Sequence, residues 1–243
     1  MKEWITGRNP VYECLRANRR HFFNLRVLKG ADHKGVLGDA LGLARQHHVP
    51  IRLVEKQQLA AITSNHQGVA LQVNGFSYRN LDAIINFSQK ANQPLFVLLL
   101  DHIQDPQNLG TLIRSAEVFG VHGIVLPGRR AAGITPAVVN ASSGAAEHLI
   151  IAQMNIAQAI DALKDAGVWV VGLDMDKSAQ KLADIDLNGP LAVIVGGEGS
   201  GLGRLVKEKC DHIAYIPMRG RTASLNAATA GSIALYEASR TRE

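Results

Sequence analysis

The sequence has little cysteine, few aromatic residues and no long apolar run. Its two cysteines, Cys14 and Cys210, lie far apart and fit no CxxC spacing, so we expect reduced thiols and no structural zinc site. No apolar stretch approaches the length that spans a bilayer, and no apolar signal segment follows the first charged residues. These absences favour a cytoplasmic protein without a membrane anchor.

What is present describes an ordinary folded chain of 243 residues, 47% of them hydrophobic and 19% charged. This length is sufficient for one large domain or two small ones. The net charge is +5, and residues 1–30 alone carry the same excess, with seven Lys or Arg and two Glu. A solubilising surface explains this excess, and so does a surface that binds the phosphates of a nucleic acid.

The pattern of apolar residues divides the chain into two parts. Helix and strand patterns alternate as far as residue 75 and predict a small α/β domain, and the polar stretch 76–94 predicts a linker with one helix. From residue 95 to the C-terminus, uninterrupted apolar strands such as "PLFVLLLD" alternate with helices, which predicts a parallel sheet covered on both faces. Ligands bind beyond the carboxyl ends of such strands. The candidate loops therefore follow Leu100, Leu126, Leu173, Val195 and Ile216.

The loop after Leu100 reads "DHIQDPQNLGTLIRSAEVFG". Its Asp-Pro pair makes a turn, and Asn108 is a fair N-cap for the helix that follows. Arg114 lies off the apolar stripe of this helix and above Gly110, where the absent side chain leaves space for a ligand. For an isolated arginine, a surface pairing with Glu117 is the simpler explanation.

The loop after Val195 brings a strand directly into closely spaced glycines around Glu198, in "AVIVGGEGSGLGRL". It has no Gly-Lys-Ser/Thr for a phosphate-binding loop, and no acid at the end of the next strand for a dinucleotide site. We therefore expect the backbone here to pass close to a small ligand. An acid that complements the dipole of the following helix is the alternative role for Glu198.

The loop after Ile216 leads into the last helix, in "IPMRGRTASLNAATAGSIALYE". Ser224 is expected to cap this helix, and Asn226, inside its first turn, is expected to donate a hydrogen bond. The small and apolar residues of the helix suit tight packing against another backbone. A capped and well-packed C-terminal helix with no further role also explains the pattern.

Taken together and in order, the three loops resemble the three motifs of the SpoU/TrmH-type ribose methyltransferases of the SPOUT superfamily. The matching residues are Asn108-Leu109-Gly110 with Arg114, Gly197-Glu198-Gly199 with Gly201-Leu202, and Ile216-Pro217-Met218 with Ser224-Leu225-Asn226. The resemblance covers residues 95–243, and "GRNPVYECL" and "HQGVALQV" resemble the family's N-terminal substrate-binding domain. The family often has serine at the position of Ala228, so residue 228 receives no polar role.

This resemblance implies a methyltransferase domain over 95–243 with a deep trefoil knot, which periodicity alone could not predict. It implies a ribosomal-protein-like RNA-binding domain over 1–75, and a homodimer whose active site is built partly across the interface. It also implies S-adenosylmethionine as the cofactor, held largely by backbone groups. The implied cofactor-binding residues are Gly196, Gly197, Ile216, Met218, Ser224 and Leu225.

The implied reaction is methylation of a ribose 2′-hydroxyl, with Arg114 nearest the reacting hydroxyl and with Asn108, Glu198 and Asn226 organising the pocket. Arginine keeps its proton in proteins, so a clamp on the adjacent phosphate is physically easier than a general base, although both roles stay open. The residues expected to contact RNA are Arg8, Arg16, Arg19, Arg20 and Arg114.

The expected substrate is a guanosine of 23S rRNA, because the N-terminal domain resembles that of ribosomal-RNA members of the family. A guanosine of tRNA is the second candidate, since tRNA members share the catalytic motifs. A third candidate comes from a different class of protein, a non-catalytic RNA-binding or ribosome-assembly factor. The intact set of motif residues counts against this third candidate.

Overall fold

The structure is a computed structural model of the chain, and it describes residues 2–176, 178–197, 199, 201–222, 224–240 and 242. It divides into two compact units. Unit 1 lies within residues 1–77 and 134–148, and unit 2 within residues 78–133 and 149–243. The sequence predicts a first domain over 1–75 and a second over 95–243. The structure divides the chain after residue 77 and adds the segment 134–148 to the first unit.

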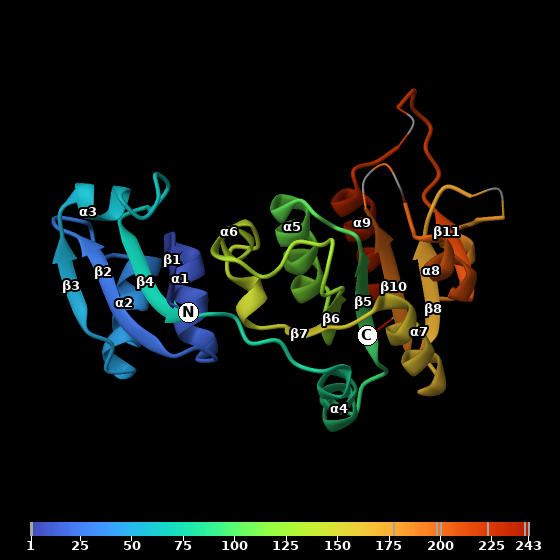
Figure 1. The fold of residues 1–243 in the computed structure, drawn as a ribbon, viewed down its shortest axis with the longest axis horizontal. Coiled ribbons are helices and arrows are strands. Elements are labelled where there is room, and N and C mark those ends of the chain that lie inside the picture. Colours follow the sequence, from blue (N-terminus) through green and yellow to red (C-terminus); the bar gives the residue numbers. More distant parts are fainter. Residues whose placement is uncertain are drawn as a thin grey trace. The chain divides into compact units, whose positions relative to one another are not determined.

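Unit 1 contains a four-stranded sheet in the order β1-β4-β2-β3, in which only β2 and β3 run parallel (Figure 1). The predicted strands and helices of this region are present, and β1 is an additional strand that the sequence pattern did not indicate. The strands are β1 (Lys2–Thr6), β2 (Phe22–Leu28), β3 (Ile51–Val54) and β4 (Val69–Asn74). The helices are α1 (Arg8–Ala17), α2 (Val36–Gln46), α3 (Lys56–Ala60), α6 (Pro136–Ala141) and the short 3-10 helix η1 (Ala145–Glu147).

The core of unit 1 lies between one face of this sheet and the helices α1 and α2. Ile5, Leu25 and Leu71 lie side by side on three strands and are fully buried. Leu15 of α1 and Leu37 of α2 are also fully buried. Fully burying a leucine or isoleucine side chain contributes about 1.5–3 kcal/mol, so this layer is the main source of stability in the unit.

A buried ion-pair cluster joins the segment 134–148 to the rest of unit 1. The guanidinium of Arg20 donates two hydrogen bonds to the carboxylate of Glu147, at 2.7 and 2.9 Å, and a further one to Glu3. The side chains of Arg20 and Glu147 are 2% and 1% exposed. This geometry corrects the expectation that Arg20 contacts RNA, because the guanidinium is enclosed and its charge is already matched by carboxylates.

Unit 2 contains a seven-stranded sheet in the order β7-β6-β5-β10-β8-β11-β9, and all its strand pairs are parallel, as predicted (Figure 1). The strands are β5 (Phe96–Asp101), β6 (Gly123–Leu126), β7 (Ile150–Gln153), β8 (Trp169–Leu173), β9 (Gln180–Lys181), β10 (Leu191–Gly196) and β11 (His212–Tyr215). The helices are α4 (Leu81–Ala91), α5 (Pro106–Val118), α7 (Ile156–Asp165), η2 (Leu182–Asp184), α8 (Arg204–Lys209) and α9 (Ala227–Ser239).

Both faces of the unit 2 sheet are covered by helices. On one face, Ile194 of β10 belongs to a buried cluster with Ile160 of α7 and Val206 of α8. On the other face, α9 packs so closely on the sheet that a Cβ at Gly231 would lie 2.4 Å from Leu112 of α5 and 2.9 Å from Val195 of β10. Glycine at 231 therefore sets the distance between α9 and its neighbours, and this positions the loop that precedes the helix.

Within the described part of the chain, none of the helices combines the length and the apolar character that crossing a bilayer requires. The same part contains no group of three or more His, Cys, Asp or Glu side chains placed to hold a metal ion. The trefoil knot stays a prediction.

Candidate active site

The carboxyl ends of β8, β10 and β11 surround a cavity of about 510 Å³ in unit 2. β10 lies between β5 and β8 in the sheet, with β11 beyond β8, so the loops that leave these strands meet at one edge. Leu173, Val195 and Ile216 mark three of the five loops that the sequence singles out, and all three line the cavity. The volume is within the range of small-molecule sites in proteins.

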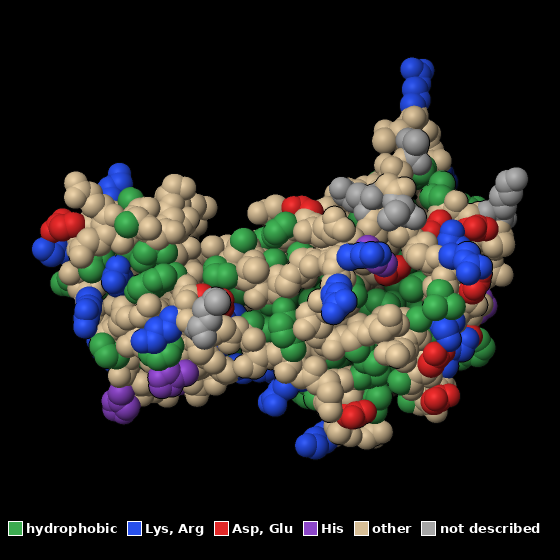
Figure 2. All heavy atoms as spheres, in the orientation of Figure 1, with side chains coloured by type: hydrophobic (Ala, Val, Ile, Leu, Met, Phe, Trp, Pro, Cys, Tyr) green, Lys and Arg blue, Asp and Glu red, His purple; other side chains and the backbone are tan. Residues whose placement is uncertain are grey.

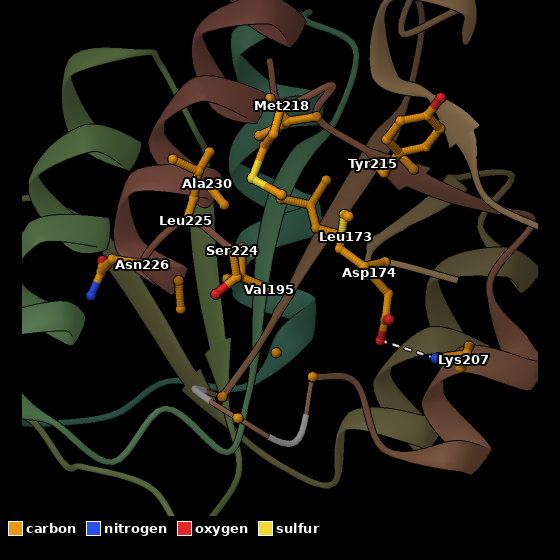
Figure 3. Close-up of a pocket in the computed structure, with 18 residues that line it drawn as sticks. Leu173, Asp174, Val195, Lys207, Tyr215, Met218, Ser224, Leu225, Asn226 and Ala230 are labelled. Carbon is orange, nitrogen blue, oxygen red and sulfur yellow. Dashed lines mark ion pairs between the residues drawn. The ribbon is translucent and has the colours of Figure 1, made fainter. Parts of the chain in front are cut away.

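All six residues that the resemblance implies for cofactor binding line this one cavity. They are Gly196, Gly197, Ile216, Met218, Ser224 and Leu225. Figure 3 shows the side chains of Met218 and Leu225 directed into the cavity, with Asn226 on the opposite side from Asp174 and Lys207. Glu198, expected to help organise the pocket, lies outside the described residues.

The glycines of the second motif are required by close backbone contacts. A Cβ at Gly196 would lie 2.3 Å from the carbonyl carbon of Gly201, and a Cβ at Gly197 would lie 2.6 Å from the carbonyl oxygen of His102. Gly201 has a φ of +61° and donates its N–H to the Gly197 oxygen at 3.1 Å. Side chains at these positions would displace the loop, so the glycines are needed for contacts within the chain, and the close approach to a small ligand stays a prediction.

Asp101, at the end of β5, ties two of the loops together. Its buried carboxylate accepts a hydrogen bond from the Gly203 N–H at 2.8 Å through one oxygen. The other oxygen lies 2.6 Å from Nδ1 of His102. His102 has a left-handed backbone, with φ +61°, and a half-exposed ring. The first motif is thus fixed to the loop that follows the glycines.

The third motif differs from the expectation at the start of α9. Asn226, and not Ser224, is the N-cap: its Oδ1 accepts hydrogen bonds from the backbone N–H groups of Ala228 at 2.9 Å and Thr229 at 3.2 Å. Asn226 has extended backbone angles, φ −58° and ψ 143°, and the helix begins at Ala227. Asn226 therefore lies immediately before the first turn, at the capping position that asparagine favours, and not inside the turn.

The first motif shows a similar shift. The N-cap of α5 is Asp105, whose carboxylate accepts the Asn108 N–H at 3.0 Å, and Pro106 occupies the first helical position. Asn108 therefore does not cap the helix, since a proline after an aspartate is the more favourable start. Its side chain is used elsewhere: Nδ2 of Asn226 donates to Oδ1 of Asn108 at 3.0 Å. This bond joins the first and third motifs.

A second cavity, of about 420 Å³, lies beside the first. It is lined by residues of the first motif, including His102, Asp105 and Asn108, and by Gly201 and Gly203. Gly201 lines both cavities, and the Asn108–Asn226 bond connects a residue of one cavity to a residue of the other. The site thus offers two adjacent spaces with paired amides between them.

Arg114 lies on α5, exposed and off the buried stripe of Leu109, Leu112, Ile113 and Ala116, as the helix phase predicts. Gly110, one turn earlier, is buried. Of the arginines expected to contact RNA in unit 1, Arg8, Arg16 and Arg19 are exposed, and Figure 2 shows Lys and Arg side chains at several places on the surface of this unit. The Arg16 guanidinium pairs with Glu13 at 3.1 Å, and Arg8 donates to the Gln67 carbonyl at 3.3 Å.

The sequence reasoning missed an ion pair in the wall of the larger cavity. Asp174 Oδ2 lies 3.1 Å from the Lys207 ammonium and accepts the Leu202 N–H at 3.1 Å (Figure 3). The pKa of Lys207 is raised: burial lowers it, but Asp174 and then Asp176 favour the charged form more strongly. Asp174 follows a strand end, and that position was the available signal, since ligands collect there in parallel sheets.

Fold and site together define an α/β protein with a ligand cavity at the carboxyl edge of a parallel sheet. Comparison with known families is specific. The SpoU rRNA Methylase family model matches residues 95–236, and the model for RNA 2′-O ribose methyltransferase substrate binding matches residues 4–79. The chain belongs to the SpoU methylase family and is an RNA methyltransferase of the SpoU/TrmH type.

Relatives and solved structures agree with this assignment. YacO of Bacillus subtilis, assigned to the TrmH family of tRNA/rRNA methyltransferases, is 39% identical over 99% of this chain and 96% of its own length. An AdoMet-bound rRNA methyltransferase from Sinorhizobium meliloti is 26% identical, with a TM-score of 0.80 over 98% of this chain and 87% of its own. The A. aeolicus TrmH/SpoU tRNA modifying enzyme is 25% identical and has a TM-score of 0.55 over 61% of this chain and 75% of its own.

Proposed function

We propose that this protein, in the cytoplasm, transfers a methyl group from S-adenosylmethionine to a ribose 2′-hydroxyl of RNA. The observation that carries the proposal is the pair of adjacent cavities joined by the Asn108–Asn226 hydrogen bond. A group transfer requires two reactants side by side, and the acceleration then comes largely from their positioning. In this proposal the larger cavity holds the cofactor and the smaller receives the target nucleotide.

The residues of the larger cavity fit S-adenosylmethionine. Apolar side chains of Leu173, Val195 and Met218 offer a surface for a flat base, and the glycine loop lets polar groups approach the backbone. Asp174 and Lys207 provide one charge of each sign, which suits a ligand that carries cationic groups and a carboxylate. When bound, this cofactor supplies an electrophilic methyl group.

Arg114 acts as the clamp for the RNA phosphate next to the target ribose and so positions the 2′-hydroxyl. The guanidinium keeps its proton at neutral pH, and a planar fork of donors matches a phosphate. The phosphate or water receives the proton that the hydroxyl loses. The hydrogen bond between Asn108 and Asn226 fixes the position of the two cavities relative to each other, and Glu198 organises the pocket with these residues.

The favoured substrate is a guanosine of 23S rRNA, with tRNA as the second candidate. Support comes from the extent of the structural matches. The S. meliloti rRNA methyltransferase matches 98% of this chain, whereas the A. aeolicus tRNA modifying enzyme matches 61%. An additional RNA-binding unit is therefore shared with a protein described as acting on rRNA, which is the basis for the preference.

The protein acts as a homodimer in this proposal. Val118 at the end of α5 is 64% exposed, and Ile233 and Tyr236 of α9 are 39% and 53% exposed. The rings of Phe119 and Tyr236 lie 5.7 Å apart, so these side chains form part of one surface on two packed helices. Exposed apolar groups of this kind favour burial against a second copy. Tyr236→Arg should give a monomer in light scattering.

The activity is tested with labelled S-adenosylmethionine and unmodified total RNA. The expected result is incorporation that maps to a 2′-O-methylguanosine of 23S rRNA. The same methyl group should be missing from the 23S rRNA of cells without the protein. Incorporation into tRNA alone would support the second candidate. No incorporation, together with no cofactor binding, would instead leave a non-catalytic RNA-binding or assembly factor.

A further inference from the structure

The unit 1 sheet has a second face, opposite the core side, and its composition is unusual. The strand register places Arg26 between Ala70 and Arg52, and Gln72 between Trp4 and Asn24. These positions alternate with the buried Ile5, Leu25 and Leu71, so they point away from α1 and α2. We name this surface the open face. Its members are Lys2, Trp4, Asn24, Arg26, Arg52 and Gln72, together with Phe23, which lies at the register shift between Phe22 and Asn24 and whose ring contacts Lys2.

The open face stacks cations on aromatic rings. The guanidinium of Arg26 lies 4.6 Å from the centre of the Trp4 ring, and the ammonium of Lys2 lies 4.1 Å from the centre of the Phe23 ring. Lys2 and Arg52 are exposed, while Trp4, Phe23 and Arg26 are half-buried. None of the seven members is acidic. The face therefore combines a net positive charge with two aromatic surfaces.

Packing within unit 1 explains only part of this surface. The short helix α3 covers one end, where Leu59 forms a buried cluster with Val54 and Ala70, and Trp4 packs against the edge of that cluster. Asn24 donates to Gln72 at 2.7 Å, while the side-chain oxygen of Asn24 is buried and has no hydrogen-bond partner among the described residues. The charged groups of Lys2, Arg26 and Arg52 do not stabilise such an apolar cluster. Because they collect three positive charges on one face, this face is suited to a polyanionic partner.

We propose that the open face binds a single-stranded segment of the RNA substrate, with bases stacking on Trp4 and Phe23 and phosphates pairing with Lys2, Arg26 and Arg52. The inference rests on the proposed function, because it supplies the RNA. Unpaired bases expose the flat surfaces that aromatic side chains and guanidinium planes stack on, whereas a duplex offers chiefly phosphates and 2′-hydroxyls. Duplex RNA should therefore bind this face more weakly.

The test measures binding of fluorescein-labelled RNA to the full chain without cofactor, using a twelve-nucleotide single strand and a duplex of the same length. Arg52→Gln and Arg45→Gln form a matched pair, since both remove one exposed charge from unit 1 and Arg45 lies on α2, away from the open face. Arg52→Gln should weaken single-strand binding about fivefold and reduce the salt slope by about 0.7, as one lost phosphate contact would. Arg45→Gln should stay within about twofold of wild type.

Phe23→Leu tests the stacking part of the proposal, because it keeps the side chain apolar and removes the ring. It should weaken binding of the single strand and leave binding of the duplex unchanged. Equal effects of Arg52→Gln and Arg45→Gln would overturn the proposal. If Phe23→Leu does not fold, as judged by its thermal unfolding, the matched arginine pair decides alone.

These readouts are separate from the proposed activity, since they require neither cofactor nor methyl transfer. If Arg52→Gln weakens RNA binding as expected but the wild-type protein transfers no methyl group, the proposal for the open face stands and the proposed activity is rejected. If Arg52→Gln transfers methyl groups and binds RNA as the wild type does, the proposed activity stands and RNA binding by the open face is rejected.

Discussion

The side-chain amides of Asn108 and Asn226 meet at 3.0 Å although 118 positions separate them in the chain. Asn226 also caps α9 through its other amide atom, so one residue both begins the last helix and holds the first motif. The two roles use different atoms, Oδ1 for the cap and Nδ2 for the bond to Asn108. They can therefore be separated by substitution.

Asn226→Ser should keep the cap and lose the bond to Asn108. Serine is a good N-cap, whereas Asn226→Ala removes both interactions and should cost about 1 kcal/mol of stability. We expect Asn226→Ser to unfold near the wild-type temperature and yet to lose at least tenfold in methyl transfer. Asn108→Ala should match it in activity. Full activity of Asn226→Ser would show that the bond between the motifs is dispensable.

Arg114→Ala and Arg114→Lys should both lose nearly all turnover while the Kd for S-adenosylmethionine stays near wild type. Lysine keeps the charge but not the planar fork that grips a phosphate through two donors. Single-turnover methyl transfer and calorimetric cofactor binding check the two halves of the prediction. A fully active Arg114→Lys would contradict the two-donor clamp.

Asp174→Asn should weaken binding of S-adenosylmethionine more than binding of its demethylated product. The carboxylate lines the cavity, and the cofactor carries a sulfonium charge that the product lacks. We expect the ratio of the two Kd values to shift several-fold. Asp176→Asn is the matched control, because Asp176 also contacts Lys207, at 3.3 Å, and is not among the described residues that line the cavity. An equal shift in both variants would argue against a direct role for Asp174.

Glu147→Gln should destabilise the protein strongly, because it leaves the Arg20 charge buried without its main partner. Breaking such a pair costs about 3–5 kcal/mol. Denaturant unfolding measures this change. Arg16→Ala removes an arginine whose pair with Glu13 is half-exposed, so its effect should stay within about 1 kcal/mol. Similar small effects of both substitutions would mean that the Arg20 cluster is solvated in solution.

His122 should make unit 2 sensitive to acid. Burial, and then the positive charge of Arg242, lower the pKa of its imidazole below the usual 6.5. Its Nδ1 accepts the Phe96 N–H at 2.9 Å, which requires that nitrogen to carry no proton. The unfolded chain then binds a proton more readily than the folded one, so stability is full above pH 6.5 and falls as the pH drops below it. His122→Gln should flatten this part of the stability profile in urea titrations between pH 7.5 and 5.

The sequence predicted the parallel sheet well, because β5 and β10 are uninterrupted apolar runs that only a doubly covered sheet can bury. The helix caps were predicted a few residues away from their true positions. Ser224 and Asn226 are both good caps, and α9 begins after Asn226, whose side chain accepts the N–H groups of Ala228 and Thr229. β1 was missed, since "KEWIT" is short and its partner β4 lies far along the chain.

Other parts of the site depend on contacts that no local pattern contains. The ion pair of Asp174 and Lys207 forms between a strand end and a helix, so neither residue is distinctive in its own segment. The stretch 134–148 contains α6 and η1, but its position in unit 1 depends on Arg20 with Glu147 and on Glu13 with His148, pairs that are 127 and 135 positions apart. Such long-range electrostatics are invisible to periodicity.

The buried pair of Arg20 and Glu147 has a consequence for biosynthesis. A nascent chain that has emerged only as far as residue 77 contains Arg20 and Glu3 but lacks Glu147, which accepts two hydrogen bonds from the guanidinium. The first unit can complete its interior only after residue 147 has left the ribosome, together with the first strands of the second unit. Maturation of the two units is thereby interleaved in time, and a fragment cut at residue 77 should be recovered as an unstable, protease-sensitive product.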